Sequence, residues 1–328
     1  MGQAARPTRR ALLGLAALAA GAGPALALLP ARATLLVPGP EDGPLLHWAG
    51  RLAAALARGT GGVMLDCLVL GGPDGVTAAN RFATAAAPDG HTLLALPGAA
   101  AQARLAGDPR ARFDGAGWVP LCAAQAPAVL AGRQPLPGLG ISPLRLALAA
   151  PDAATGAALL ALDLLGHAAQ PVMGLPPGRA EAALAAGAVE AVVLQGADIP
   201  ARLAALGARP WCVLDEARDP ALPEVPAWTE LAPGGDAALR AACAAAAANA
   251  RLVCALMLPA LTPADLVALW RAAVGRWLEE EQRAGLPPGL RIQPAAELPP
   301  VLAPLAPPPE AVLAYREWLL RRLRWKPD

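Results

Sequence analysis

The chain has 328 residues, of which 55% are hydrophobic and 16% charged, and its formal net charge is +1. A net charge near zero removes the electrostatic argument for nucleic-acid binding, which calls for a basic stripe. The length suffices for two domains of ordinary size, and the apolar residues do not gather in long spanning runs, so we expect a large buried core rather than a membrane bundle.

Residues 1–27 are typical of an export signal. A basic segment free of acids precedes an apolar run, and a small-x-small cleavage site follows at Ala25-Leu26-Ala27, with a second candidate at 31–33. The stretch "TRRALL" (8–13) resembles a twin-arginine signal without its usual Phe, which leaves the general secretory route open. An uncleaved anchor helix is disfavoured because Gly and Pro interrupt the run and it is short for a span. We predict export with cleavage near Ala27.

Strand-like and helix-like segments alternate after the signal. The expected strands cover 33–39, 63–71 and 91–96, and the expected helices cover 44–57 and 73–87. Pro88-Asp89-Gly90 marks a tight turn between the second helix and the third strand, because Pro presets φ and Gly accepts positive φ. The β-α-β-α-β order predicts an α/β domain with a largely parallel sheet.

The pattern changes at 117–132, where two apolar runs stand close together without a helix between them. A second β-α-β series follows. Its strands are expected at 145–152, 189–196 and 210–215, and its helices at 155–167, 179–187 and 198–207.

The remainder begins with a Pro-punctuated loop that ends in a short helix. After it we expect a helix at 234–251, a strand at 252–259, a long helix up to about Gly285, a Pro-rich segment at 298–309 and a final helix. Thr262 is the predicted N-cap of the long helix, with Pro263 in its first turn.

The five cysteines all follow the predicted signal: Cys67, Cys122, Cys212, Cys243 and Cys254. No two of them form C-x-x-C, and their spacing fits no zinc signature. All except Cys243 lie in apolar stretches expected to be strands, where a cysteine is most often a small buried hydrophobe. One disulfide remains open, and the sequence does not select a pair. We predict no metal site.

Five segments follow one another in an order typical of one family. They are "ATLLVPGPEDGPLLHWAGRLAAAL" (33–56), "GGPDGVTAANRFATAAAPDGHTLLAL" (71–96), "MGLPPGRAEAALAAGAVEAVVLQGADIPARLAALG" (173–207), "ARDPALPEVPAWTEL" (217–231) and "LMLPALTPADLVALWRAAV" (256–274). The set resembles the substrate-binding proteins of tripartite tricarboxylate transporters, the Bug-type periplasmic receptors. The most specific match is the corner A-x-P-D-G-[YH]-T-L-L, and the resemblance extends over roughly 28–328.

The resemblance implies a two-domain periplasmic-binding-protein fold of type II, an α/β flytrap with a ligand cleft between its domains. Domain 1 is expected at 34–124 plus 253–328, and domain 2 at 125–252. It further implies a periplasmic monomer without a cofactor, which captures a small, carboxylate-bearing organic molecule and delivers it to membrane permease subunits. An exported receptor of the same fold used for sensing or scavenging is an alternative, and an exported α/β enzyme is another.

Four loops between strand ends and helix starts are expected to form the site, because helix N-termini present backbone N–H groups and a positive dipole end. The predicted ligand-binding residues are Pro40, Glu41, Asp42, Gly43, Gly98, Ala99, Asp152, Thr155, Gln195 and Asp198. A carboxylate captured by backbone donors needs neither an arginine nor a metal. Glu41 and Asp42 depart from the family pattern: they would repel an anion if they faced the pocket, or accept from an amino group or a cation.

The sequence offers no catalytic residues that we would select. Ser142 is the only serine and lacks the G-x-S-x-G context of a nucleophile elbow. His47, His91 and His167 lack the spacing of metal ligands, and no cysteine lies near a histidine in sequence. Trp48 follows the first loop and is expected to pack in the core, although it would also suit an apolar ligand face. We therefore predict a binding protein rather than an enzyme.

Overall fold

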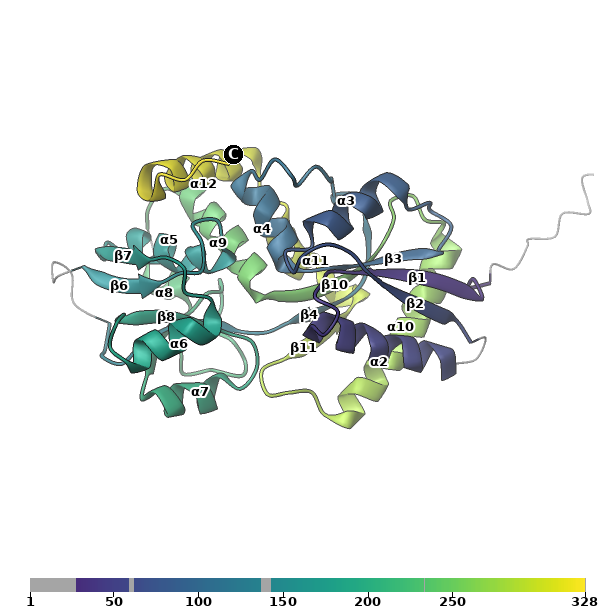
Figure 1. Cartoon of the computed structure of the whole chain (residues 1–328), viewed down its shortest axis with the longest axis horizontal. Helices are drawn as coiled ribbons and strands as arrows, with labels where there is room; N and C mark the ends of the chain where they lie inside the picture. The colour runs from purple at the N-terminus through teal and green to yellow at the C-terminus, as the bar shows by residue number, and fades with distance from the viewer. Residues whose placement is uncertain (1–27, 59–61, 137–142, 233, 328) are drawn as a thin grey trace, which may run out of the picture.

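A computed structural model describes residues 28–58, 62–136, 143–232 and 234–327. The predicted export signal and Ser142 lie outside these residues. Two β-sheets lie side by side, and helices cover both faces of each (Figure 1). This is the α/β architecture that the alternation of strands and helices predicts.

The first sheet has six strands in the order β11-β4-β10-β3-β1-β2. Its strands are β1 (Arg32–Val37), β2 (Met64–Val69), β3 (Thr92–Leu96), β4 (Val119–Gln125), β10 (Leu252–Leu258) and β11 (Arg291–Pro294). β1 pairs in parallel with β2 and β3, whereas β10 runs antiparallel to both β3 and β4, and β11 runs antiparallel to β4. The expectation of a largely parallel sheet is therefore correct only for the β1–β3 unit.

The second sheet has five strands in the order β7-β6-β8-β5-β9. Its strands are β5 (Ala128–Gly132), β6 (Leu144–Ala147), β7 (Ala169–Val172), β8 (Ala191–Gln195) and β9 (Arg209–Val213). β6 is parallel to β7 and β8, and β5 is antiparallel to β8 and β9.

The chain crosses between the two sheets where the sequence pattern changes. The two neighbouring apolar runs are β4 and β5, and only Ala126 and Pro127 separate them although they belong to different sheets. The chain returns where helix α9 (Ala237–Arg251) runs directly into β10. Near these crossings the buried carboxylate of Asp219 accepts from both Nη atoms of Arg291 on β11, at 3.0 and 3.1 Å. This ion pair ties the two halves together.

Besides α9, eight helices of eight or more residues are described. They are α2 (Pro44–Arg58), α3 (Val76–Ala85), α4 (Gly98–Ala106), α5 (Ala157–Leu164), α6 (Pro177–Ala185), α7 (Ile199–Leu206), α10 (Ala264–Ala284) and α12 (Pro309–Leu323). Shorter ones are α8 (Trp228–Leu231), α11 (Leu298–Leu302), and the 3-10 turns η1 (Ala154–Gly156), η2 (Ala295–Glu297) and η3 (Ala303–Leu305). The prediction that Thr262 caps α10 is wrong: the N-cap is Pro263, because the Thr262 hydroxyl bonds backwards to the Pro259 carbonyl at 2.8 Å.

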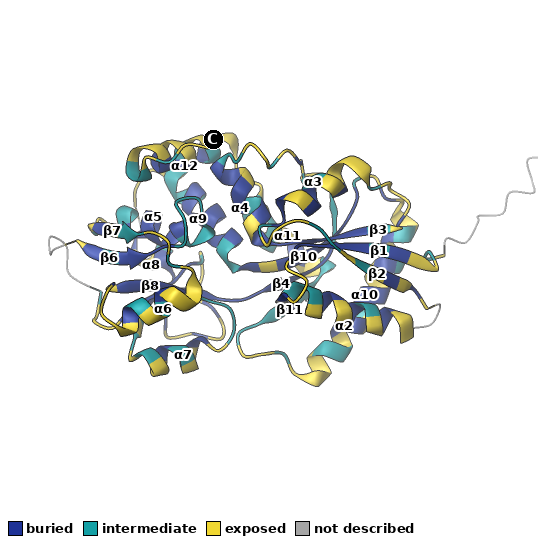
Figure 2. Cartoon of the chain, in the orientation of Figure 1, coloured by how far each residue is buried: buried dark blue, intermediate teal, exposed yellow. Residues whose placement is uncertain are grey.

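Both faces of the inner strands of each sheet are buried, as Figure 2 shows by their dark colour, whereas the edge strand β2 exposes Met64 and Leu68. One face of the six-stranded sheet packs on α2 and α10, and the other on α3 and α11. One face of the five-stranded sheet packs on α6 and α7, and the other on α5, α9 and α12. Burial on both faces explains why the strands appear as continuous apolar runs in the sequence. Trp48 lies in the core, edge-on to Trp277 with ring centroids 5.2 Å apart.

The C-terminal segment leaves the six-stranded sheet and returns to the other half, where α12 packs against the buried cluster beneath the five-stranded sheet. Arg316 of α12 donates to the carbonyls of Leu105 and Arg104 at the end of α4, at 3.1 and 3.0 Å. The division into domains at the predicted boundaries stays a prediction.

The corner at Pro88-Asp89-Gly90 has the geometry that its residues predict. Gly90 has a φ of 77°, and the Asp89 side chain accepts from the amide of His91 at 2.9 Å. The Trp270 indole of α10 donates to the Gly90 carbonyl at 3.2 Å, and a Cβ at Gly90 would lie 3.1 Å from that indole nitrogen. The corner is thus packed against the core and turns the chain into β3, in the middle of the sheet.

All five cysteines are free, and four of them lie in strands as expected. Burial raises the pKa of the Cys122 and Cys212 thiols to about 12, so both stay protonated at neutral pH. Within the described part of the chain, no three His, Cys, Asp or Glu side chains are grouped as a metal site would require. Of the helices described, none has the length and apolarity needed to span a membrane.

Candidate functional site

A cavity of about 510 Å³ lies between the two halves of the molecule. We call one side of the cavity the six-stranded wall, which is made of the cavity-lining residues within 39–110. These residues come from the β1–α2 loop and the start of α2, the β2–α3 loop, and α4 with the segments on either side of it. The opposite side, the five-stranded wall, consists of its lining residues within 147–195, from the β6–η1 segment, the start of α6 and β8. The α9–β10 junction closes the cavity between the walls.

Seven of the ten predicted ligand-binding residues line this cavity: Pro40, Gly43, Gly98, Ala99, Asp152, Thr155 and Gln195. Their gathering follows from topology, because the loops at the carboxyl ends of the strands face one another across the two sheets. That these residues bind a ligand stays a prediction.

Three predicted residues, Glu41, Asp42 and Asp198, do not line the cavity. Glu41 and Asp42 are exposed at the tip of a tight turn that closes when the Gly43 amide donates to the Pro40 carbonyl at 3.0 Å. Asp198 is exposed in the left-handed region, with a φ of 57°, and its amide donates to the Pro288 carbonyl at 3.0 Å. The two acids of the first loop therefore do not contribute charge to the cavity lining.

Helices begin at the cavity on both sides, and the first N–H groups of a helix have no partner within it. Gly98 and Ala99 were expected in one of the four site loops, but they begin α4, for which Pro97 serves as the N-cap in an extended conformation. Gly98 is required here: a Cβ would lie 2.0 Å from the Asn249 carbonyl oxygen and 2.8 Å from that of Leu252. The start of α4 therefore sits directly against the α9–β10 junction.

A buried polar network, here called the floor network, joins Gln102, Tyr315, Asn249 and the Asp152 carbonyl. Gln102 donates through Nε2 to the Tyr315 hydroxyl at 2.9 Å and to the Asp152 carbonyl at 3.1 Å. Asn249 donates through Nδ2 to Gln102 Oε1 at 3.0 Å. A carbonyl only accepts, so Asp152 fixes the orientation of the Gln102 amide, and this in turn fixes that of Asn249.

Two polar atoms beside this network have no hydrogen-bond partner among the described residues: the acceptor Oδ1 of Asn249 and the hydroxyl Oγ1 of Thr155. Asn249 is only 3% exposed, and both residues line the cavity. Buried polar atoms are usually paired, so unpaired ones call for a group that is not part of the chain or a functional reason.

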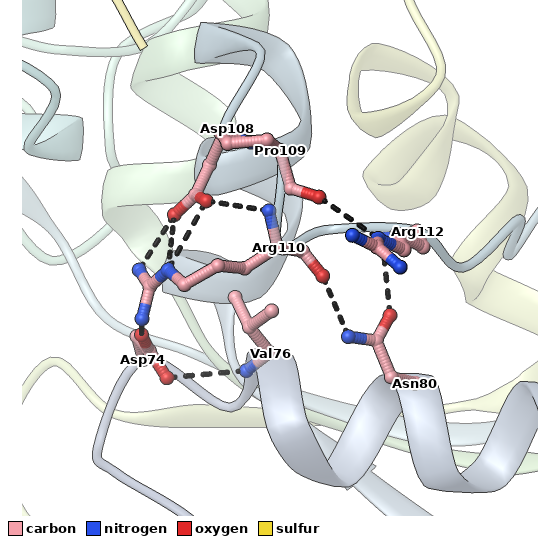
Figure 3. Close-up of polar contacts among 7 residues, drawn as sticks. All are labelled: Asp74, Val76, Asn80, Asp108, Pro109, Arg110 and Arg112. Carbon is pink, nitrogen blue, oxygen red and sulfur yellow. Dashed lines mark hydrogen bonds and ion pairs between the residues drawn. The ribbon is translucent and has the colours of Figure 1, made fainter. Parts of the chain in front are cut away.

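The six-stranded wall carries a charged cluster of Asp74, Asp108 and Arg110 (Figure 3). The Arg110 guanidinium donates to Asp108 through Nη2 at 2.6 Å and Nε at 3.0 Å, and to Asp74 through Nη1 at 3.1 Å. The hydrogen bonds from Arg110 lower the pKa of the Asp108 carboxyl below its ordinary value. Asp74 also accepts from the amide of Val76 at 3.2 Å, at the start of α3.

Asn80 of α3 holds the segment that carries this cluster. Its side chain donates to the Arg110 carbonyl at 2.6 Å and accepts from the Arg112 amide at 3.0 Å (Figure 3). Sequence reasoning missed the cluster, because its members lie in two loops that are far apart in the chain. The Asp-Pro-Arg stretch at 108–110 was the available signal, since Asp before Pro favours a turn and charges are scarce in this sequence.

Asp152 on the five-stranded wall differs from these aspartates. Within the part of the chain that the structure describes, its carboxylate has neither a hydrogen bond nor an ion pair, and it does not cap η1, whose N-cap is Ala153. The charged residues in the lining are Asp74, Asp108, Asp152 and Arg110, so the described lining has a formal charge of −2.

Comparison with known proteins defines the class of fold. No model of a protein family matches the sequence, and neither does any curated protein. Among solved structures, a TctC solute-binding protein from Polaromonas superimposes with a TM-score of 0.65 at 16% identity, over 89% of this chain and 98% of that one. The two-domain fold predicted from the sequence is thereby confirmed.

Two further solved structures share this fold. MatC from Rhodopseudomonas palustris, with bound malate, has a TM-score of 0.58 at 24% identity, over 89% of this chain and 100% of that one. The periplasmic binding protein BugD has a TM-score of 0.56 at 17% identity, over 87% and 97% of the two chains. These are the kinds of protein that the sequence segments resemble, and the likeness is one of fold.

Proposed function

We propose that this chain is an extracytoplasmic solute-binding protein of the TctC and Bug type, which captures a small organic molecule between its two halves. The observation that carries the proposal is the cavity of about 510 Å³, lined by both walls in a fold shared with TctC. Its volume is in the range of small-molecule sites. A ligand that contacts both walls favours the closed arrangement, because it gains contacts there that the open form lacks.

The proposed ligand bears a carboxylate. The MatC structure holds malate, and the helix starts around this cavity supply the unpaired N–H groups that favour an anionic oxygen. Export to the periplasm and delivery to permease subunits of a tripartite tricarboxylate-type transporter complete the proposal. They are supported by the sequence resemblance and by the predicted signal.

We propose binding rather than catalysis, because the residues seen to line the cavity include no Ser, Cys, His, Lys or Tyr. Thr155 is the only hydroxyl among them, and its Oγ1 makes no hydrogen bond to a base of the kind that activates a nucleophile.

The test is a thermal-shift screen of residues 28–328 against dicarboxylates, monocarboxylates, amino acids and polyamines. A ligand at one hundred times its Kd adds about 2.7 kcal/mol to the free energy of unfolding, which shifts Tm by several degrees. The variant Ala99→Phe fills the cavity from α4 and abolishes the shift, whereas Ala237→Phe, at the exposed start of α9, retains it. A chain that responds to no member of the panel, or a shift that survives in Ala99→Phe, contradicts the proposal.

A further inference from the structure

We infer that the ligand carries a cationic nitrogen that pairs with Asp152, so that the cavity selects a zwitterion with one carboxylate over a dicarboxylate. This inference rests on the proposed function and assigns its substrate class.

Asp152 is the one aspartate of the described cavity lining whose carboxylate is unpaired. Asp152 is partly buried in the cavity lining, and its carboxylate makes no hydrogen bond or ion pair within the described structure. A carboxylate removed from water without a partner is unfavourable, and closure of the two walls on a ligand would remove it further. A positive group on the ligand compensates this loss, whereas a second carboxylate on the ligand increases it.

Arg110 is the only cation of the described lining. Its guanidinium is held by both Asp108 and Asp74, with contacts of 2.6 to 3.1 Å. Those two carboxylates already outweigh its single charge, so the six-stranded wall does not offer a free positive side chain to a second anionic group. The positive potential that remains comes from the helix starts, and it suits one carboxylate.

The described cavity lining also holds a buried acceptor without a partner. Asn249 Oδ1 lacks a donor, and Asn249 cannot turn its amide round without losing the bond to Gln102. The unpaired Thr155 hydroxyl can donate as well as accept, so it favours neither an ammonium nor a carboxylate. A carboxylate supplies only acceptors at neutral pH, whereas an ammonium supplies three donors. The unpaired Asn249 oxygen and the charge of Asp152 therefore favour the same chemical group.

The experiment uses ligands matched in length that differ at one end only. Adipate, 6-aminohexanoate and hexanoate form one set, and succinate, 4-aminobutyrate and butanoate form a second. Isothermal titration calorimetry measures each Kd on the mature chain, on Asp152→Asn, and on Asp265→Asn as the matched control. Asp265 is an exposed aspartate at the start of α10, outside the cavity lining.

We expect an amino member to bind at least tenfold more tightly than its dicarboxylate. Asp152→Asn removes that preference and Asp265→Asn retains it. Tighter binding of adipate or succinate, or an amino preference that survives in Asp152→Asn, overturns the inference and leaves solute binding intact. Failure of both sets and of the whole thermal-shift panel contradicts the proposed function itself, so the two failures are distinguishable.

Discussion

The two walls of the cavity hold their polar groups in opposite ways. On the six-stranded wall, Asp74 and Asp108 are paired with Arg110, and Gly98 fits against the Asn249 carbonyl with no room for a side chain. On the five-stranded wall, Asp152 is unpaired. Beside that wall, at the start of α6, Gly178 has nothing within 4 Å of the place where a Cβ would stand.

This difference separates groups that maintain the structure from groups that are free to meet a ligand. A charge that is paired within the chain, or a glycine that lets two segments pack closely, contributes to stability. Substituting such a residue should change the free energy of unfolding of the unligated protein. A group without a partner contributes little to the unligated fold, and its removal is measured only with a ligand present. Variants on each side of the cavity test this separation.

The largest effect is expected at the start of α4. Gly98→Ala places a methyl group against two backbone carbonyls that cannot move independently, so we expect the free energy of unfolding to fall by about 3 kcal/mol. Gly178→Ala, in the first turn of α6, is expected to raise it by about 0.5 kcal/mol, because alanine favours the helix and meets no neighbour. Urea unfolding of both variants measures the contrast, and equal changes would show that the two helix starts are equally constrained.

The next effect is expected in the floor network. Gln102→Leu leaves the Asn249 amide, the Tyr315 hydroxyl and the Asp152 carbonyl without their partner, at a cost of about 2 kcal/mol. Thr155→Val is the control, since its Oγ1 has no partner to lose, and the exchange should be neutral or slightly stabilising. A loss in Thr155→Val as large as that in Gln102→Leu would mean that the hydroxyl is paired in solution.

Arg110→Met tests the charged cluster through pH. Arg110 lowers the folded-state pKa of Asp108 below its unfolded value, so its contribution is complete above that unfolded value, near pH 4, and disappears as the pH falls through the folded value. We expect the free energy of unfolding of the wild type to exceed that of the variant by about 1 kcal/mol at pH 7. This difference should shrink at pH 3.

The control for that experiment is Arg112→Met. The Arg112 guanidinium bonds the Pro109 carbonyl at 3.2 Å and forms no ion pair within the described residues. Its effect should therefore not change between pH 7 and pH 3. Urea unfolding at pH 7 and pH 3 measures both effects. If the loss of stability in Arg110→Met were the same at both pH values, protonation of Asp108 would not be the cause of the pH dependence.

Much of the fold follows from the sequence, because the strands are apolar runs buried on both faces and the helices between them carry turn and cap residues. β11 was missed because Arg291–Pro294 is short and partly polar, and it becomes a strand only by pairing with β4, which lies far away in the chain. The start of α4 was missed because Pro97-Gly98 has the composition of a loop.

The candidate site was predictable where topology alone decides it. Loops after strands meet at one edge, so Gly43, Gly98 and Gln195 could be placed together from the sequence. The outward position of Glu41 depends on the closure of a turn, and the pairing of Asp74 with Arg110 depends on two loops meeting in space. Neither is encoded in local patterns, and both change the charge of the cavity.

The smallest effect on stability is expected for Asp152→Asn without ligand. No hydrogen bond or ion pair of the described residues is lost, so the free energy of unfolding should stay within about 0.5 kcal/mol of wild type. Asp108→Asn, which weakens the pair with Arg110, is the matched change on the opposite wall and should cost more. Urea unfolding at pH 7 compares the two variants. If Asp152→Asn destabilised the protein as much as Asp108→Asn, Asp152 would belong to the structure rather than to the ligand. If it did not, a loss of binding to 6-aminohexanoate or 4-aminobutyrate in Asp152→Asn would be attributable to the ligand contact alone, since the unligated fold would be unchanged.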